Sequence, residues 1–328
     1  MSPPVDRTPE QVSLSVVVPT YNGEAHLEEA LESIAAQSTL NGVEILVVDD
    51  GSTDKTMGIL EKAAQRLPMT IHRREHQGNW VANTNFALRK ATGSYTTILH
   101  QDDRWVPGRV STLQELTRSW PNAVIFSHPV WIVSPRGRRL GLSTNPLPPS
   151  PPCHEGAYVA ERLLVQNWMA MPAPVFNRRA ALAAGGMDES LLYTADWDLW
   201  LKLIDAGRLF YSPKPLAEFR IHLGAQTMSI SADPDRFRLE LLTVIKRHLD
   251  TWAPRLPRAD LVRKVAESAI ELNCFLAGIV HGRRGFPLAL IRRALPLGPR
   301  GWYRLWDHSR VLERAWPRLL VHSPFFRG

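Results

Sequence analysis

The chain of 328 residues has only two cysteines and no apolar run long enough to cross a membrane. Cys153 and Cys274 form neither a disulfide framework nor a metal-ligand spacing, so we expect a protein of the reducing cytoplasm. Residues 1–12, which we expect to be flexible, lack the apolar stretch of a secretion signal. The best candidate for a membrane segment, residues 272–280, is far shorter than the roughly 20 residues that a spanning helix needs.

Motifs of several common enzyme classes are also missing. No G-x-G-x-x-G follows the first predicted strand, which argues against a dinucleotide-dependent dehydrogenase, and there is no P-loop. No Ser/His/Asp or Cys/His arrangement suggests a covalent nucleophile. His72, His128 and His154 show no metal-ligand spacing, and we expect them to be structural or solvent-facing.

Acidic residues are scarce in the last part of the chain. From residue 251 to the end there are 14 Lys and Arg but only five Asp and Glu, a net charge of +9, whereas the whole chain has +7. Trp302, Tyr303, Trp306 and Trp316 lie among these arginines, a mixture that suits an anionic membrane surface or nucleic acid. A third interpretation is that this basic region is a helical cap packed on the rest of the protein, with its arginines exposed to solvent. Because no nucleic-acid motif accompanies the charge, we expect no nucleic-acid partner.

Short apolar strands alternate with amphipathic helices over residues 13–133. We expect strands at 13–18, 43–48, 69–73 and 95–99, and helices at 24–37, 54–66 and 80–91. This alternation predicts an α/β fold, a mostly parallel central sheet with helices on both faces. Helical patterns dominate from residue 233 onward. The proline-rich segment 145–152 is expected to be a surface loop, either a plain connection or a lid.

The tetrapeptide His-Gln-Asp-Asp at residues 100–103 closes the strand predicted at 95–99. Adjacent carboxylates at a strand end can hold one divalent cation against a diphosphate, but only if the chain turns there, because neighbouring side chains of a strand point to opposite faces. We expect that turn at Asp102 and Asp103, and a helix that begins at Pro107. Taken alone, the pair is also typical of a solvated turn.

Five segments in order resemble family 2 glycosyltransferases, which have the Rossmann-like GT-A fold. They are residues 16–23 (VVVPTYNG), 47–54 (VVDDGSTD), 99–103 (LHQDD), 195–201 (ADWDLWL) and 219–222 (FRIH). The resemblance covers about residues 13–230 and implies a GT-A domain there. A helical, basic C-terminal region would follow at 231–328.

The resemblance implies a nucleotide site made by the loops that follow the strands. Its residues would be Pro19, Thr20, Tyr21, Asp49, Asp50, Asn83 and Asp102. Tyr21 would lie near the nucleobase, Asp50 would accept a hydrogen bond from the base, and Asp49 would support that turn. The donor would be a UDP or dTDP sugar.

The same resemblance implies a metal site and a base. Asp102, Asp103 and His222 would bind Mg²⁺ or Mn²⁺, because these cations prefer oxygen ligands and bridge substrate phosphates. Asp196 would be the general base for an inverting transfer. By position alone, Asp196 is also an ordinary acidic residue at a helix start. Asp198 is the rival base, but with only one residue between them Asp196 and Asp198 cannot lie on the same face of a helix.

Two departures from the family pattern leave other functions open. His100 stands where the first acid of the Asp-x-Asp motif is common, and Ala195 stands where an acid often precedes the base. Both would favour a catalytically inactive module that only binds sugar nucleotides. A nucleotidyltransferase of similar fold is a weaker alternative, since residues 19–24 contain no Lys or Arg to grip a triphosphate.

The resemblance also implies the wider role. The acceptor would be a saccharide or a lipid-linked saccharide, used in surface polysaccharide or glycolipid assembly. Peripheral binding to the inner face of the cell membrane, through the basic C-terminal region, is a hypothesis that such an acceptor would suit.

Overall fold

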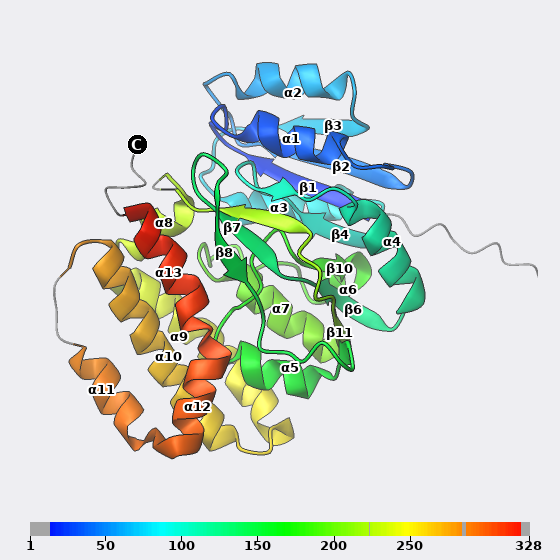
Figure 1. Cartoon of the computed structure of the whole chain (residues 1–328). Helices are drawn as coiled ribbons and strands as arrows, with labels where there is room; N and C mark the ends of the chain where they lie inside the picture. The colour runs from blue at the N-terminus through cyan, green and yellow to red at the C-terminus, as the bar shows by residue number, and fades with distance from the viewer. Residues whose placement is uncertain (1–13, 223, 284–286, 323–328) are drawn as a thin grey trace, which may run out of the picture.

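The computed structural model describes residues 14–222, 224–283 and 287–322, so the segment 1–12 lies outside the described residues. A sheet of eight strands forms the centre, in the order β3-β2-β1-β4-β10-β6-β11-β9 (Figure 1). Its strands are β1 (Leu14–Thr20), β2 (Val43–Asp49), β3 (Met69–Arg73), β4 (Tyr95–Ile98), β6 (Ala123–Ser127), β9 (Cys153–His154), β10 (Val175–Asn177) and β11 (Arg208–Tyr211).

The first four strands in chain order run parallel to one another, as the alternation of strands and helices predicts. β10 is antiparallel to β4 and β6, and β9 is antiparallel to β11. Every residue of β1 is buried, which agrees with its unbroken apolar run at the centre of a sheet covered on both faces. The expected mostly parallel α/β fold is therefore confirmed.

A second sheet of four strands lies beside the carboxyl edge of the first. Its order is β5-β12-β7-β8, and its strands are β5 (Arg104–Trp105), β7 (Val130–Val133), β8 (Arg139–Ser143) and β12 (Ala217–Arg220). β12 pairs with β5, which directly follows the tetrapeptide at 100–103. This pairing brings the end of β4 next to the segment that contains His222.

Seven helices cover the main sheet. They are α1 (Leu27–Ala35), α2 (Thr56–Ala64), α3 (Trp80–Lys90), α4 (Arg109–Ser119), α5 (Gly156–Leu163), α6 (Arg178–Ala183) and α7 (Ala195–Ala206). The prediction that a helix begins at Pro107 is wrong. The short strand β5 occupies the space before it, and Gly108, with φ of 82°, makes the turn into α4.

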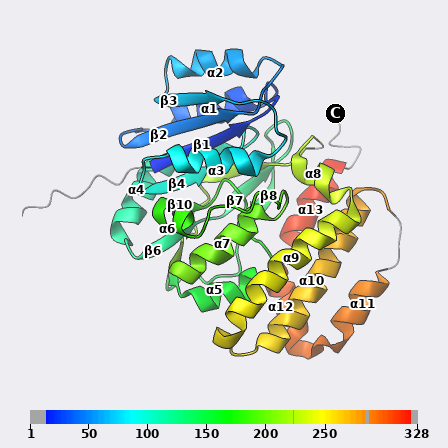
Figure 2. The same cartoon turned by 180° about the vertical axis from the view of Figure 1, so that it is seen from behind.

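The described residues from 226 to 322 are mainly helical. They contain α8 (Gln226–Ser231), α9 (Pro234–Trp252), η1 (Ala253–Arg255), α10 (Ala259–Val280), α11 (Leu288–Ala294), η2 (Leu295–Leu297), α12 (Gly298–Ser309) and α13 (Val311–His322). Seen from behind, α7, α9 and α10 pack one against the next, with α11 outermost (Figure 2). No helix in the described part of the chain is both long and apolar enough to span a bilayer.

One hydrophobic core joins the two parts of the chain. The cluster that contains Val17 of β1 continues through Trp200 of α7 to Leu241 of α9 and Ile270 of α10. The boundary expected near residue 230 therefore separates sequence patterns but cuts through a shared core.

Candidate active site

Three loops at the carboxyl edge of the sheet are fastened to one another by side chains. Gln101 accepts a hydrogen bond from the N–H of Tyr21 at 2.9 Å and donates one to the carbonyl of Tyr21 at 3.0 Å. The N–H of Asn22 donates to the Ser52 hydroxyl, and the Asn22 side chain accepts from the N–H of Thr53, each at 2.9 Å. These contacts give the edge a fixed frame of the kind that a binding site needs.

Tyr21 and Asp50 lie together at one end of this edge. The Asp50 carboxylate accepts hydrogen bonds from the N–H groups of Gln77, at 3.1 Å, and Gly78, at 2.9 Å. His76 stacks on the Tyr21 ring with 4.1 Å between ring centroids, and its Nδ1 is 3.0 Å from the Asp50 carboxylate. The aromatic ring can stack on a nucleobase, and the neighbouring carboxylate can accept a hydrogen bond from an N–H of that base.

Four other residues expected at the nucleotide site are buried below the loops and hold them by hydrogen bonds or packing. Asp49 is buried, and both the N–H and the hydroxyl of Ser52 donate to its carboxylate. Asn83 is buried and accepts from the Arg74 guanidinium at 2.6 Å. Pro19 and Thr20 are buried at the end of β1, and the Thr20 hydroxyl is 3.3 Å from the Asp49 carboxylate.

Asp102, which follows β4 of the main sheet, pairs with His222, which follows β12 of the second sheet. Nε2 of His222 lies 2.8 Å from Oδ2 of Asp102. Burial acts to raise the pKa of the Asp102 carboxyl, but the hydrogen bond to His222 and the His100 imidazole nearby lower it below its ordinary value overall. This carboxylate is therefore ionised at neutral pH, as a metal ligand must be.

Asp103 has a different environment. Its side chain is buried, its Oδ1 accepts the backbone N–H of Arg220 at 2.9 Å, and its Oδ2 has no hydrogen-bond partner. It is not among the residues that line the cavity described below. In this structure Asp103 holds β12 through the Arg220 N–H, and its role as a metal ligand stays a prediction.

Asp196 lies in the first turn of α7. Its carboxylate accepts the Asn167 side-chain amide at 2.9 Å and the Trp197 N–H at 2.7 Å. Burial raises the pKa of Asp196 to about 6. A carboxylate with a pKa near the working pH can accept a proton from an attacking hydroxyl group.

Asp198 is fully buried and in contact with three basic side chains. It pairs with Lys202 at 2.6 Å, and with Arg247 and His248 at 2.8 Å each. Burial acts to raise the pKa of Asp198, but the hydrogen bonds from His248 and Lys202 hold it well below its ordinary value. The structure therefore favours Asp196 over Asp198 as the cavity-facing carboxylate.

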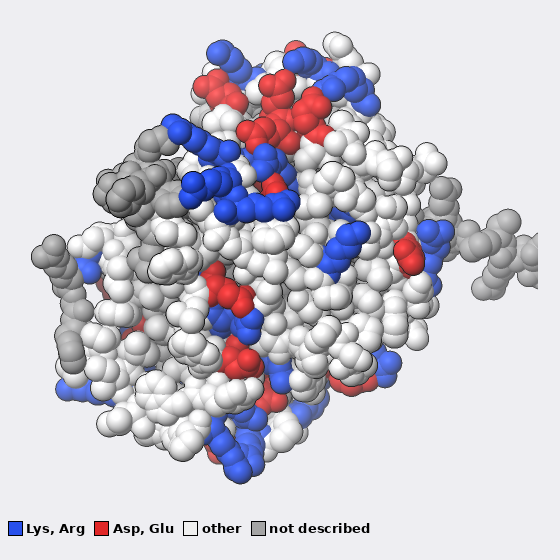
Figure 3. All heavy atoms as spheres, in the orientation of Figure 1, with Lys and Arg blue, Asp and Glu red and all other residues white. Residues whose placement is uncertain are grey.

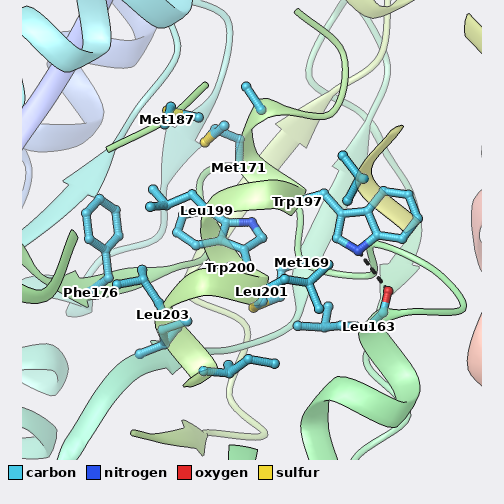
Figure 4. Close-up of a cluster of buried hydrophobic side chains, with 14 of the residues drawn as sticks. Leu163, Met169, Met171, Phe176, Met187, Trp197, Leu199, Trp200, Leu201 and Leu203 are labelled. Atoms are coloured by element: carbon cyan, nitrogen blue, oxygen red, sulfur yellow. Dashed lines mark hydrogen bonds between the residues drawn. The ribbon is translucent and has the colours of Figure 1, made fainter. Parts of the chain in front are cut away.

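The helix that holds Asp196 is buried on several sides. Figure 4 shows Trp197 and Trp200 of α7 among methionine and leucine side chains, with Trp197 Nε1 donating to the Leu163 carbonyl at 2.7 Å. Both indole rings are almost completely buried. Such packing fixes the position of a carboxylate at the start of the helix.

One cavity of about 330 Å³ is lined by both Asp102, the proposed metal ligand, and Asp196, the proposed base. His100, Asn167 and Arg220 also line it. It continues from the carboxyl edge of the sheet to α8, α9, α10 and α13.

Comparison with known proteins agrees with this geometry. Residues 15–162, which include the loops after β1, β2 and β4, match the model of glycosyl transferase family 2. This segment is a family 2 glycosyltransferase domain. The chain is also 27% identical over 229 residues to an uncharacterized glycosyltransferase of Rickettsia typhi. That alignment covers 65% of this chain and 65% of the relative, so this chain spans just under two thirds of the relative's length.

Solved structures show that the fold is GT-A. TarS of S. aureus (residues 1–349), in complex with UDP-GlcNAc, superposes with a TM-score of 0.58 at 18% identity, covering 93% of this chain and 91% of that chain. The mannosyltransferase PcManGT of Pyrobaculum calidifontis, in complex with GDP-Man and Mn²⁺, gives a TM-score of 0.53 at 17% identity, covering 94% and 88%.

The residues that could hold a cation in this glycosyltransferase domain are few. Within the described ranges no three or more His, Cys, Asp or Glu side chains form a metal site by themselves. Asp102 and His222 nevertheless supply two adjacent ligands, and Mg²⁺ sites commonly use one or two carboxylates plus substrate phosphates. The donor set therefore fits a cation whose remaining ligands come from a diphosphate.

Several cavity residues were not expected from the sequence. Asn167, which orients Asp196, belongs to none of the five segments, and no spacing signal identifies it. Arg314 and Arg318 of α13 were grouped with the other arginines of the basic C-terminal region, yet they line the cavity. Only the packing of α13 against β8 and α10 reveals this position.

Proposed function

We propose that this chain transfers a sugar from a nucleoside diphosphate sugar to an acceptor hydroxyl with inversion at the anomeric carbon. The main support is that Asp102, paired with His222, and Asp196 line the same cavity. TarS bound to UDP-GlcNAc and PcManGT bound to GDP-Man support a nucleotide sugar as the donor. Tyr21 and Asp50 would receive the nucleobase, and a UDP or dTDP sugar is the donor that we propose.

In the proposed step, one bond forms as another breaks. The acceptor oxygen attacks the anomeric carbon while the bond from that carbon to the diphosphate oxygen breaks. The acceptor proton passes to the Asp196 carboxylate, and the diphosphate leaves with the electron pair. Asn167 holds the Asp196 side chain in place by a hydrogen bond of 2.9 Å.

Asp102 and His222 would hold Mn²⁺ or Mg²⁺ in this proposal, and Mn²⁺ in the PcManGT complex supports the choice. A bound cation would act as a Lewis acid on the departing diphosphate. Because an imidazole nitrogen is a better ligand for transition metals than for Mg²⁺, we expect Mn²⁺ to support more activity.

Release of nucleoside diphosphate tests the proposal. The purified chain is incubated with UDP, dTDP and GDP sugars and simple saccharide acceptors, with Mn²⁺, Mg²⁺ or EDTA. We expect release from one donor class, and its loss in EDTA. Donor binding is followed in parallel by thermal shift, because a ligand that binds only the native state raises its stability.

Two other functions predict different results. An inactive sugar-nucleotide-binding module, which His100 and Ala195 would favour, gives a thermal shift but no release with any acceptor. A nucleotidyltransferase would bind a nucleoside triphosphate, for which the loop at residues 19–24 has no Lys or Arg. Release of pyrophosphate from triphosphates would identify this second case.

We further propose peripheral binding to an anionic membrane on the cytoplasmic side, in surface polysaccharide or glycolipid assembly. Trp302 and Trp306 of α12 and Trp316 of α13 are exposed, the last with 61% of its surface accessible. In Figure 3, uncharged surface over α12 and α13 borders a column of acidic and basic side chains, and basic side chains lie along the lower rim of the molecule. Tryptophan next to arginine suits the boundary between lipid headgroups and acyl chains.

Sedimentation with liposomes tests this membrane proposal. We expect the chain to pellet with anionic vesicles at low salt, and the double variant Trp306→Gln, Trp316→Gln to pellet less. Trp120→Gln, an exposed tryptophan at the end of α4, is the matched control. Equal pelleting of all three proteins with neutral vesicles would contradict the proposal.

A further inference from the structure

Two arginines at the far end of the cavity have no carboxylate partner among the residues that the structure describes. Arg314 donates to the Ser309 carbonyl at 3.0 Å and to the side-chain oxygen of Asn273, and Arg318 donates to the Arg314 carbonyl at 2.7 Å. No carboxylate of a described residue lies within 4.0 Å of either guanidinium. Burial lowers the pKa of Arg314 to about 10, so it remains charged at neutral pH.

Both arginines are partly buried, and a partly buried cation without a charged partner favours a ligand that supplies the missing charge. Two neighbouring arginines do have carboxylate partners: Arg310 pairs with Glu313, and Arg304 pairs with Glu161 at 2.6 Å. Among the described residues that line the cavity, Asp102 and Asp196 are the only acids. The end near α13 therefore carries a net positive charge that suits an anionic group.

Contacts along one wall connect these arginines to the proposed base. Arg314 bonds to Asn273, and the Asn273 amide donates to the Gln166 side chain at 2.8 Å. Gln166 precedes Asn167, which bonds to Asp196. Arg314 and Arg318 thus belong to the cavity wall that also holds Asp196, the proposed general base. Tyr21 and Asp50, which would bind the nucleobase, do not line this cavity.

Most of the other residues that line this end of the cavity are apolar: Met228, Phe237, Leu241, Leu276, Ala277, Ile279 and Val280. The polar side chains of Gln226, Thr227 and Ser231 line it as well. A free saccharide presents hydroxyl groups, which gain little from such a wall, whereas a hydrocarbon chain is removed from water there. Ile279 is 42% exposed, so the apolar wall reaches the protein surface.

The helix α13 connects this cavity with the proposed membrane surface. Arg314 and Arg318 line the cavity, while Leu312 and Trp316 of the same helix are exposed. In Figure 1, α13 lies beside α10 and ends close to α8. A hydrocarbon chain that enters between these helices would lead directly from a membrane surface to the site.

We propose that the acceptor is a lipid-linked saccharide with a phosphate group between its hydrocarbon chain and its sugar. The phosphate lies at Arg314 and Arg318, the chain follows the apolar wall of α8, α9 and α10, and the sugar hydroxyl reaches Asp196. The inference rests on the proposed function, since it names the acceptor class for that reaction. The phosphate remains unchanged in the transfer.

Binding of dodecyl phosphate, below its micelle concentration, tests this inference by isothermal titration calorimetry. We expect the full chain to bind it, and Arg318→Gln and Arg314→Gln each to weaken binding at least about tenfold through loss of a charged hydrogen bond. Ile279→Asp should also weaken binding, because it places a negative charge beside the chain. Arg292→Gln, an exposed arginine on α11, is the control with the same charge change.

Two comparison ligands separate the contributions of chain and phosphate. Inorganic phosphate has no chain, and dodecyl maltoside has no anion, so we expect each to bind at least about tenfold more weakly than dodecyl phosphate. Equal binding of dodecyl maltoside would overturn the phosphate site, and equal binding of inorganic phosphate would overturn the lipid chain. If Arg314→Gln fails to fold, binding by the Arg318→Gln variant, which changes a partly exposed residue, still decides the result.

The outcome is distinct from that of the proposed function. Donor binding, measured by thermal shift with the nucleotide sugars, does not depend on the acceptor end of the cavity. A chain that binds a nucleotide sugar but not dodecyl phosphate keeps its proposed function and loses this inference. A chain that binds no nucleotide sugar loses both.

Discussion

Two stretches of the chain place acidic residues close together, one after β4 and one at the start of α7. In each, one carboxylate lines the cavity and the other fastens the fold. Asp102 faces His222 while Asp103 accepts the backbone N–H of Arg220. At α7, Asp196 faces the cavity while Asp198 is enclosed by basic side chains.

The two stretches differ in how their structural carboxylate is stabilised. Asp198 has Lys202, Arg247 and His248 as basic partners, and its pKa is lowered. Asp103 has one backbone hydrogen bond, and burial raises its pKa well above the ordinary value. Asp198 therefore connects α7 to α9 through charge, whereas Asp103 holds β12 through a single N–H.

The largest effect is expected from Asp196→Asn. Removing the proposed base should lower kcat by about 100- to 10,000-fold, the usual contribution of a general base, while donor binding stays unchanged. Steady-state release of nucleoside diphosphate measures the change. Asp205→Asn, at the other end of α7, is the matched control and should keep full activity. Normal turnover by Asp196→Asn would show that another group accepts the proton.

Asp198→Asn should mainly change stability. The substitution leaves Lys202 and Arg247 without their shared carboxylate and removes the acceptor of His248, which we expect to lower the free energy of unfolding by about 3 kcal/mol. This is at the low end for a buried ion pair, because Arg247 and Lys202 keep contact with water. Urea unfolding measures the loss. A variant as stable as the native chain, but inactive, would reverse the roles assigned to Asp196 and Asp198.

Asp102→Asn should weaken metal binding. Loss of a charged oxygen ligand should lower the apparent affinity for Mn²⁺, measured in the presence of the nucleoside diphosphate, at least about tenfold. Titration of Mn²⁺ followed by electron paramagnetic resonance gives this affinity. Unchanged affinity would remove Asp102 from the proposed metal site.

Activity should fall on the acidic side of neutrality. The proposed base must be ionised to accept a proton, and burial raises the pKa of Asp196 to about 6. The rate kcat/KM should therefore decrease about tenfold for each pH unit below 6 and level off above it. The residual activity of Asp196→Asn should lack this decrease. A decrease at the same pH in that variant would assign it to another group.

The smallest effect is expected from Asp103→Asn. An amide oxygen can accept the Arg220 N–H as a carboxylate does, so the free energy of unfolding should change by no more than about 1 kcal/mol. Affinity for Mn²⁺ should stay within about twofold of the native value, in contrast to Asp102→Asn. The same two assays measure both quantities. A large loss of Mn²⁺ affinity would instead support the sequence-based prediction that Asp103 is a metal ligand.

Much of the carboxyl edge could be predicted from the sequence. Strands at 43–48, 69–73 and 95–99 were expected close to their observed bounds, because each is a short apolar run with a turn after it. The start of α4 was not, because Pro107 is as compatible with a turn as with a helix start. Asn167 and Gln166 could not be predicted, since they reach the site through packing of a loop that belongs to none of the recognised segments.

The sequence by itself determined the α/β fold and the segments that mark a family 2 glycosyltransferase domain, because apolar periodicity and motif order are local properties of the chain. The tertiary structure alone decided which carboxylate of each pair faces the cavity, and that Arg314 and Arg318 of the last helix line it. The physical reason is that the role of a charged side chain depends on its partners and its burial, which here come from strands and helices far away in the chain.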